Sequence, residues 1–537
     1  MTYFTSRRSA VVARRGAVAT SQPLAAQAGL RMLMAGGHAV DAAVASAAAL
    51  NVLEPMSTGV GGDMFALIWD NRAKRVLALN GSGRSAAATN AADVKRKGYE
   101  RIPTSGTDAG LSVSVPGTVD GWQTALAACG RMTLRETLAP AIDYALNGFA
   151  VSEVIAYQWR TNERKLAAHP SGLELLPGGR APRFGEIVTL PTLGRTLQAI
   201  ADGGRDAFYT GPIAAQIAAF VQEQGGWLTP ADLANHHSDW DDPIHTDYRG
   251  VTVWECPPNG QGIAALMALN IAEGFALPAM AAQSPEAYHC LIESMRLAFA
   301  DALHYVADPR AVNVPIAQLL SKSYAARRRA AIQPDAAMVD VGYGNPNGSA
   351  DTVYVTAVDA EGNACSFINS VFHSFGSGLV VPSTGIVLQN RGALFSLDPA
   401  HPNYARGSQR PYQTIIPGMA TRDGELWLSF GVMGGFQQPQ GHLQVISNMV
   451  DFGMDAQRAL DALRFHIDIG GSGTVMLEAG VPDETVSALR DRGHVIEIVD
   501  GYERMLFGGG QIIARDAESG ALIAGSEPRK DGAAVGW

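Results

Sequence analysis

Thr352 is the residue whose type and position suggest chemistry most directly. It opens the apolar run 353–358, a predicted strand, and it comes after the turn-rich, polar segment 330–351, which is typical of a cleavable connection. A threonine hydroxyl is a weak nucleophile, but a cut before Thr352 would free an α-amine able to act as its base. An ordinary strand threonine is the alternative, so the hypothesis depends on the partners of this residue.

A glycine pair downstream offers such partners. Residues 431–436 (Gly-Val-Met-Gly-Gly-Phe) follow a predicted strand and precede a predicted helix. The backbone N–H groups of Gly434 and Gly435 are therefore candidates for an oxyanion hole, in which one donor contributes about 3 kcal/mol to transition-state stabilisation. A tight turn without catalytic function explains the same pair, so it supports the hypothesis without deciding it.

Other chemistry-bearing clusters fit known motifs poorly. The loop 59–63 lacks the Lys-Ser/Thr of a phosphate-binding loop and leads into a strand, which favours a structural or pocket-lining role. The spacing Gly-Ser-Gly at 81–83 does not match a serine nucleophile elbow. A polar stretch without helical metal-ligand spacing is interpreted as a solvated connector and not as a metal site; it contains His236, His237, Asp239, Asp241, Asp242 and His245.

Composition limits the class of protein. With 47% hydrophobic and 17% charged residues the chain can bury a large core, and a net charge of −10 disfavours a nucleic-acid partner. The four cysteines form no CxxC pair, so neither a zinc site nor a disulfide framework is expected. The twin arginine at 7–8 is followed by only five residues before the next arginines, and no apolar run reaches membrane length. We expect a cytoplasmic protein without a membrane span.

Strands and helices alternate in uneven blocks along the chain. This pattern predicts stacked sheets covered by helices. Helices are expected over 20–52, through most of 117–235, from the turn 256–262 through Phe275, and over 285–308, 436–451 and 455–464. Strands are expected at 64–69, 75–79, 251–255, 378–389 and 425–431, with hairpins at 353–371 and 510–524.

Taken together, the motifs resemble the γ-glutamyltransferase family of N-terminal-nucleophile hydrolases. The likeness covers nearly the whole chain, and its ordered segments are 36–44, 115–121, 247–250, 257–262, the strand at Thr352, 375–378, Gly434-Gly435 and 526–529. The branches of this family that the chain resembles include glutathione hydrolase-like proteins, oxamate amidohydrolases and glutaryl-type acylases.

The resemblance implies an α+β fold, a four-layer αββα sandwich, and a proenzyme that cleaves itself between Asp351 and Thr352. Residues 1–351 would form the large subunit and residues 352–537 the small catalytic subunit, together one αββα domain. A dimer of such heterodimers is compatible with the family. Neither a cofactor nor a metal is implied.

The family resemblance also assigns catalytic roles. Thr352 would be the nucleophile, Gly434 and Gly435 would bind the oxyanion, and Ser370 takes the position of a family threonine that hydrogen-bonds the nucleophile. The acyl-enzyme would be released by water or by an amine. The substrate would be a small amide, either γ-glutamyl-like or the monoamide of a dicarboxylic acid.

Several substrate-binding positions depart from the family pattern. In typical members of the family an arginine holds the glutamyl α-carboxylate. In this chain the matching position falls nearest Gly81, with Arg84 close by in the sequence. The family's Asn-Gln-x-x-Asp reads Asn390-Arg391-Gly-Ala-Leu394, so leucine replaces the acid that binds the α-amino group. Where typical members have a pair of serines, this chain has Gln413-Thr414.

These departures lead to a hypothesis on the substrate. The acyl group would carry a carboxylate but no α-amine, and Arg391 would bind that carboxylate with two hydrogen bonds. An arginine that only braces its loop is the alternative. Three functions therefore stay open: a γ-glutamyltransferase-like enzyme, an oxamate amidohydrolase or glutaryl/cephalosporin-type acylase, and an unprocessed, inactive ligand-binding homologue.

Overall fold

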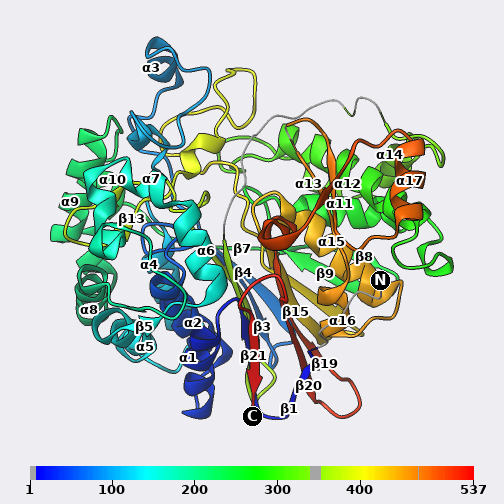
Figure 1. Ribbon diagram of the computed structural model, residues 1–537, viewed down its shortest axis with the longest axis horizontal. Coiled ribbons are helices and arrows are strands. Elements are labelled where there is room, and N and C mark those ends of the chain that lie inside the picture. Colours follow the sequence, from blue (N-terminus) through cyan, green and yellow to red (C-terminus); the bar gives the residue numbers. More distant parts are fainter. Residues whose placement is uncertain (1–7, 339–340, 342–351, 470) are drawn as a thin grey trace.

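Two seven-stranded antiparallel sheets, stacked face to face, form the centre of the molecule (Figure 1). The computed structural model describes residues 8–338, 341, 352–469 and 471–537. In order, the first sheet contains β21 (Ala533–Gly536), β2 (Ala17–Thr20), β10 (Val353–Val358), β11 (Ala364–Ser370), β3 (Asp63–Asp70), β4 (Arg75–Gly81) and β7 (Asp239–Asp241). The second contains β1 (Val11–Ala13), β20 (Leu522–Ser526), β19 (Gly509–Arg515), β15 (Glu425–Met433), β14 (Gly418–Arg422), β9 (Val251–Glu255) and β8 (Ile244–Tyr248).

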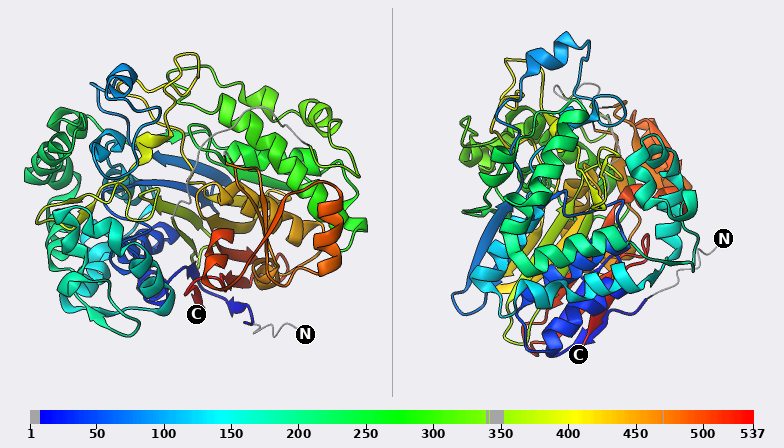
Figure 2. Two further views of the ribbon diagram at one scale, coloured as in Figure 1. Left: turned by 45° about the horizontal axis from the view of Figure 1, so that its top comes forward. Right: turned by 90° about the vertical axis from the view of Figure 1, so that its left-hand side faces the viewer.

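Helices cover the outer face of each sheet, on the left and on the right of Figure 1. Over the first sheet lie α1 (Pro23–Met34), α2 (Ala39–Leu53), α4 (Thr118–Cys129), α5 (Leu134–Asn147), α6 (Glu153–Thr161), α7 (Glu163–Ala167), α8 (Pro191–Tyr209), α9 (Pro212–Glu223) and α10 (Pro230–Ala234). Over the second lie α11 (Gly262–Ala272), α12 (Pro285–Tyr305), α14 (Lys322–Arg329), α15 (Gln437–Val450), α16 (Ala456–Asp461) and α17 (Asp483–Asp491). The predicted αββα sandwich is therefore confirmed, and Figure 2 displays its layers from two further directions.

The central strands are buried on both faces, which explains their composition. Every residue of β10 and of β11 is buried, because helices lie on one side and the second sheet on the other. Strands in such a position read as nearly continuous apolar runs. Every residue of α2 is also buried, and its many alanines allow the close packing that this position requires.

The two sheets approach each other closely at one point. A Cβ on Gly431 of β15 would lie 2.5 Å from the ring of Tyr354 on β10, so only glycine leaves room for that ring. Thr356 Oγ1 donates a hydrogen bond to Ser429 Oγ across the same interface, at 2.7 Å. These contacts fix β10 against β15, and they thereby position the residues just before β10 and just after β15.

Some predicted elements differ from the observed ones. Residues 378–389 form two short strands, β12 (Val380–Val381) and β13 (Ile386–Val387), and not one long strand. The interpretation of 236–245 as a solvated connector was wrong, because β7 and β8 lie there and His236 is buried. Asp239 of this segment forms ion pairs with Arg84, Arg310 and Arg410. A small sheet of β16 (Phe465–Ile467), β17 (Val475–Glu478) and β18 (Ile496–Val499) was not predicted.

Within the described ranges, the structure contains no helix with the combination of length and apolar character needed to span a bilayer.

The family-like tail 526–529 contributes Glu527 and Arg529 to a buried ionic cluster. Glu527 accepts hydrogen bonds from Arg464 at 2.9 Å and from Arg529 at 2.6 Å, and the N–H of Gly510 donates to the same carboxylate at 2.6 Å. Arg529 also pairs with Glu478. Glu527 is fully buried, so removal of one partner leaves charges in the interior without compensation.

We expect Glu527→Ala to lower the free energy of unfolding by about 3–5 kcal/mol, because two buried arginines lose a partner. The midpoint of urea unfolding measures this effect. Glu518→Ala, at an exposed turn, is the matched control and should leave the midpoint unchanged. Equal midpoints for the two variants would contradict the structural role of the cluster.

Candidate active site

Thr352 lies at the start of β10, beside the end of β11. It is buried, with 2% of its surface exposed, and its Oγ1 donates a hydrogen bond to Ser370 Oγ at 3.2 Å. The antiparallel register, which pairs Val353 with Asn369, brings these two hydroxyls together. Gln438 Nε2, from the first turn of the helix α15 that follows β15, approaches Thr352 Oγ1 to 3.5 Å. The predicted nucleophile and its predicted hydroxyl partner are therefore neighbours.

A strained residue holds Ser370 in place. The backbone N–H of Phe372 donates to Ser370 Oγ at 2.8 Å, and Phe372 adopts a φ of +78°, which is rare for a residue with a bulky side chain. The predicted glycine loop packs against the same strand end. A Cβ on Gly62 would lie 2.3 Å from the Ser370 carbonyl oxygen, so the loop can approach only as glycine.

The glycine pair lies between strand and helix as predicted. β15 ends at Met433 and α15 begins at Gln437, and the turn between them has φ values of +126° at Gly434 and +56° at Gly435. Within the described residues, no hydrogen bond uses the N–H of either glycine. The two N–H groups are thus available to an external acceptor.

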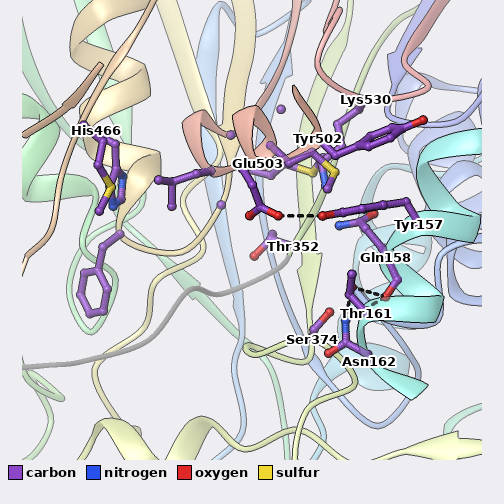
Figure 3. A pocket seen from close by; sticks show the side chains of 18 of the residues that line it. Tyr157, Gln158, Thr161, Asn162, Thr352, Ser374, His466, Tyr502, Glu503 and Lys530 are labelled. Atoms are coloured by element: carbon purple, nitrogen blue, oxygen red, sulfur yellow. Dashed lines mark hydrogen bonds between the residues drawn. The ribbon is translucent and has the colours of Figure 1, made fainter. Parts of the chain in front are cut away.

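Thr352 and Gly434 line one cavity of about 510 Å³ (Figure 3). Its wall includes Tyr157 from α6 and Tyr502 from the segment 501–507, whose rings stack with centroids 4.4 Å apart. Tyr157 Oη also donates to Glu503 Oε1 at 2.6 Å. Residues from both sides of the expected cleavage point therefore build this cavity, and Asp351 itself lies outside the described residues.

Arg391 is buried without a full set of partners. None of its surface is exposed, its Nη1 donates to Thr414 Oγ1 at 2.5 Å, and its guanidinium carbon lies 4.6 Å from the centroid of the Phe372 ring. Among the described residues, its Nε and Nη2 have no hydrogen-bond partner. Burial lowers the pKa of Arg391 to about 9, and the charge of Asp63 opposes this shift. An incompletely paired buried cation costs free energy, which an anionic ligand would recover.

Asp63 is the acidic residue whose charge acts on Arg391. Its carboxylate accepts hydrogen bonds from Gly83 N at 2.9 Å, from Gln389 Nε2 at 3.0 Å and from Gln413 Nε2 at 2.9 Å. Burial raises the pKa of Asp63 to about 6, although the Arg391 charge and these hydrogen bonds oppose the shift. Asp63 therefore orders Gln413, and its charge changes within the pH range of ordinary assays.

The remaining predicted binding residues occupy three different settings. Asn390 Nδ2 donates to the carbonyl oxygen of Thr104 at 2.9 Å and thus braces a loop. Arg84 is held in the ion pairs around Asp239, away from the cavity of Thr352. Gly81 is a packing glycine, because a Cβ there would lie 2.6 Å from Met64 Sδ.

Leu394 lines a second cavity of about 580 Å³, together with Phe372, Tyr412 and Phe436. Phe436 also lines the cavity of Thr352, so the two cavities meet at this ring. The second cavity presents an apolar side chain at the position where the family carries an acid. The same lining also includes the acids Glu100 and Asp398, so the apolar character is that of Leu394 and its aromatic neighbours and not of the whole cavity.

Several residues of the site were not recognised in the sequence as functional. Gln261 connects the two halves of the site, since its Nε2 donates to the carbonyl oxygens of Thr414 at 2.7 Å and Gly435 at 2.8 Å. It lies in the family-like segment 257–262, which was the available signal. Asp63 closes the glycine loop, whereas Gln438 and Tyr157 carry no local motif.

With this geometry established, comparison with known proteins identifies the family. The sequence matches the family described as gamma-glutamyltranspeptidase over residues 25–537. The chain belongs to the gamma-glutamyltranspeptidase family.

Relatives in the gamma-glutamyltranspeptidase family resemble the chain over its full length. The "glutathione hydrolase-like YwrD proenzyme" of Bacillus subtilis is 38% identical over 98% of this chain and 99% of its own length. The "oxamate amidohydrolase proenzyme" of Klebsiella pneumoniae is 33% identical over 98% of this chain and 100% of its own. The crystal structure of a cephalosporin acylase from Bacillus halodurans superposes with a TM-score of 0.92 at 44% identity, covering 100% and 98% of the two chains.

The raised pKa of Asp63 predicts a pH-dependent stability. Because the folded pKa lies above the unfolded value of 3.8, the folded state retains this proton longer, and its contribution to stability is lost as the pH rises through about 6. Relative to wild type, Asp63→Asn should therefore gain roughly 2 kcal/mol of stability between pH 4 and pH 7. Gln413 can rotate its amide to suit the variant, because its Oε1 has no hydrogen-bond partner within the described ranges.

Melting temperatures of the wild type and the variant across this pH range measure the difference. Asp423→Asn, at an exposed turn, serves as the control for the loss of one carboxylate. A constant difference between Asp63→Asn and wild type from pH 4 to pH 7 would refute the assignment of a raised pKa to Asp63.

Proposed function

We propose that the chain is the proenzyme of a self-processing amidohydrolase with Thr352 as its N-terminal nucleophile. The observation that carries this proposal is the position of Thr352 Oγ1, 3.2 Å from Ser370 Oγ and in one cavity with Gly434. Family membership and the proenzyme names of the relatives support it. Residues 1–351 would become the large subunit and residues 352–537 the small one.

Processing would begin with an attack of Thr352 Oγ1 on the carbonyl carbon of Asp351. The C–O bond forms, the C–N bond breaks, and the proton of the hydroxyl passes to the leaving nitrogen, which becomes the free α-amine. Water then hydrolyses the ester. The two chains would stay together, because β10 of the small subunit pairs with β2 of the large one, and β11 pairs with β3.

The mature nucleophile would use the same chemistry on a substrate amide. Its α-amine takes the hydroxyl proton as Oγ1 attacks the carbonyl carbon, and this proton then leaves with the amine product. The N–H groups of Gly434 and Gly435 would stabilise the oxyanion. Water or an acceptor amine attacks the acyl-enzyme ester and regenerates the Thr352 hydroxyl.

We further propose that the acyl group carries a carboxylate but no α-amine. Two donors of Arg391 that have no partner in the described part of the chain, and the apolar side chain of Leu394, support this proposal. The Phe372 ring covers the guanidinium and would have to move aside when the carboxylate binds. Oxamate and amides of glutaric acid both have the required chemistry, and the name of the oxamate amidohydrolase relative points in the same direction.

Thr352→Ala should abolish both processing and turnover, because it removes the attacking oxygen of each reaction. On a denaturing gel we expect one band of 56.5 kDa for the variant and two smaller bands for the wild type. Thr210→Ala, at an exposed position after α8, is the matched control and should still be cut. Cleavage in Thr352→Ala would place the nucleophile elsewhere, and an intact, inactive wild type would favour a ligand-binding homologue.

A panel of γ-glutamyl anilide, glutaryl anilide and oxamate measures the acyl specificity. We expect glutaryl anilide or oxamate to be the better substrate, and Arg391→Met to lower its kcat/KM by roughly tenfold to a hundredfold through the loss of a bidentate pair. Arg84→Met is the matched control for loss of an arginine. Efficient turnover of γ-glutamyl anilide alone would refute the proposed specificity.

A further inference from the structure

The ring of Phe372 separates Arg391 from the cavity of Leu394. In the part of the chain that the structure describes, Arg391 has no exposed surface and lines neither this cavity nor that of Thr352. Phe372 lines the cavity of Leu394, and its ring centroid lies 4.6 Å from the guanidinium carbon. Arg391 and Leu394 belong to one short 3-10 helix, η5 (Arg391–Leu394). A carboxylate that enters through this cavity therefore reaches the guanidinium after the ring has moved.

The backbone of Phe372 holds the partner of the expected nucleophile. Ser370 Oγ accepts one hydrogen bond from Phe372 N at 2.8 Å and another from Thr352 Oγ1 at 3.2 Å. The φ of +78° at Phe372 lies in the left-handed region, where a bulky side chain is strained. Such strain persists while the surrounding contacts hold it, so a displacement of the ring allows the backbone to relax.

Phe372 and His373 are held together as one unit. Their rings stack with centroids 4.2 Å apart and an angle of 27° between the planes. His373 N donates to Asn390 Oδ1 at 3.2 Å, and Asn390 Nδ2 donates to His373 Nδ1 at 3.1 Å. Asn390 directly precedes Arg391 in the chain. Because these contacts join the ring of Phe372 to the backbone that follows it, displacement of the ring also moves the N–H group that binds Ser370.

We propose that Phe372 is a positioning residue that couples the recognition of an acyl carboxylate at Arg391 to the alignment of Thr352. This inference rests on the proposed function and deepens it on the acyl side. The carboxylate replaces the Phe372 ring on the guanidinium, the backbone relaxes, and Ser370 Oγ loses one of its two donors. Ser370 then donates its own proton to Thr352 Oγ1, whose proton passes to the α-amine during the attack.

The coupling has a kinetic consequence. The free energy of carboxylate binding drives the displacement of Phe372, so it appears as faster acylation and not as tighter binding of the substrate. A carboxylate that met a freely accessible guanidinium would instead lower the concentration needed for half-saturation.

The experiment compares the 4-nitroanilides of glutaric acid and of pentanoic acid, which differ in the terminal carboxylate. Single-turnover release of 4-nitroaniline, with the processed enzyme in excess, gives the acylation rate constant and the half-saturating concentration separately. For the wild type we expect the carboxylate to raise the rate constant by at least about tenfold and to change the half-saturating concentration by less than about threefold.

Phe372→Gly separates this coupling from a loss of packing. Glycine adopts the left-handed backbone without strain and leaves the guanidinium uncovered. We expect the ratio of the two rate constants to fall toward one, and the half-saturating concentration of the glutaryl substrate to fall about tenfold below that of the pentanoyl substrate. Phe372→Ala also lacks the ring and should show the same change. Phe184→Ala, which removes an exposed phenylalanine outside both cavities, is the matched control.

Two results would overturn the coupling. In the wild type, a preference for the carboxylate that lies in the half-saturating concentration alone contradicts it without the need for any variant. In Phe372→Gly, a packing defect slows both substrates equally and leaves both ratios as in the wild type, which contradicts it as well.

Failure of this proposal is distinguishable from failure of the proposed function. If Thr352→Ala still releases 4-nitroaniline, the nucleophile assignment is wrong. If the wild type does not prefer the glutaryl substrate, the acyl specificity is wrong, and the coupling is wrong with it. If the wild type prefers the glutaryl substrate through binding alone, the proposed function stands, and the role of Phe372 is wrong.

Discussion

The close contact between β10 and β15 is the constraint on which the site depends. Because Gly431 has no side chain, the Tyr354 ring packs directly against its backbone, and this contact fixes the two sheets relative to each other. Thr352 precedes Tyr354 by two residues, and Gly434 comes three residues after Gly431. A rigid contact between buried strands therefore positions a hydroxyl and two backbone donors that belong to different sheets. Groups held on packed strands need little reorganisation when a substrate binds, and this lowers the activation free energy of the reaction.

The site also carries charge that the fold leaves incompletely compensated. The tail cluster of Glu527, Arg464 and Arg529 pairs its charges within the protein. Arg391 is buried, and among the described residues it lacks such complete pairing. Stability alone would favour an apolar side chain at this position. The anionic acyl group that we propose for the substrate would provide a physical reason for retaining this cation.

Much of the fold and of the site could be predicted from the sequence, for identifiable reasons. The hairpin at 353–371 and the turn at Gly434-Gly435 depend on local signals, which are apolar runs and glycines, and both lie where predicted. The neighbourhood of Thr352 and Ser370 results from the register of that hairpin. The contacts of Gln261 and Asp63 depend on residues far apart in the chain, which no local pattern encodes. The segment 236–245 was misjudged because its acids pair with Arg84, Arg310 and Arg410, which are distant in sequence.

Intact-mass measurement with N-terminal sequencing of the purified wild-type protein tests the central claim most directly. We predict two chains, one of which begins with Thr352-Val353-Tyr354 and ends at Trp537. A new N-terminus at any other residue, or an uncut chain of 56.5 kDa that hydrolyses amides at full rate, would contradict the assignment of Thr352 as the N-terminal nucleophile.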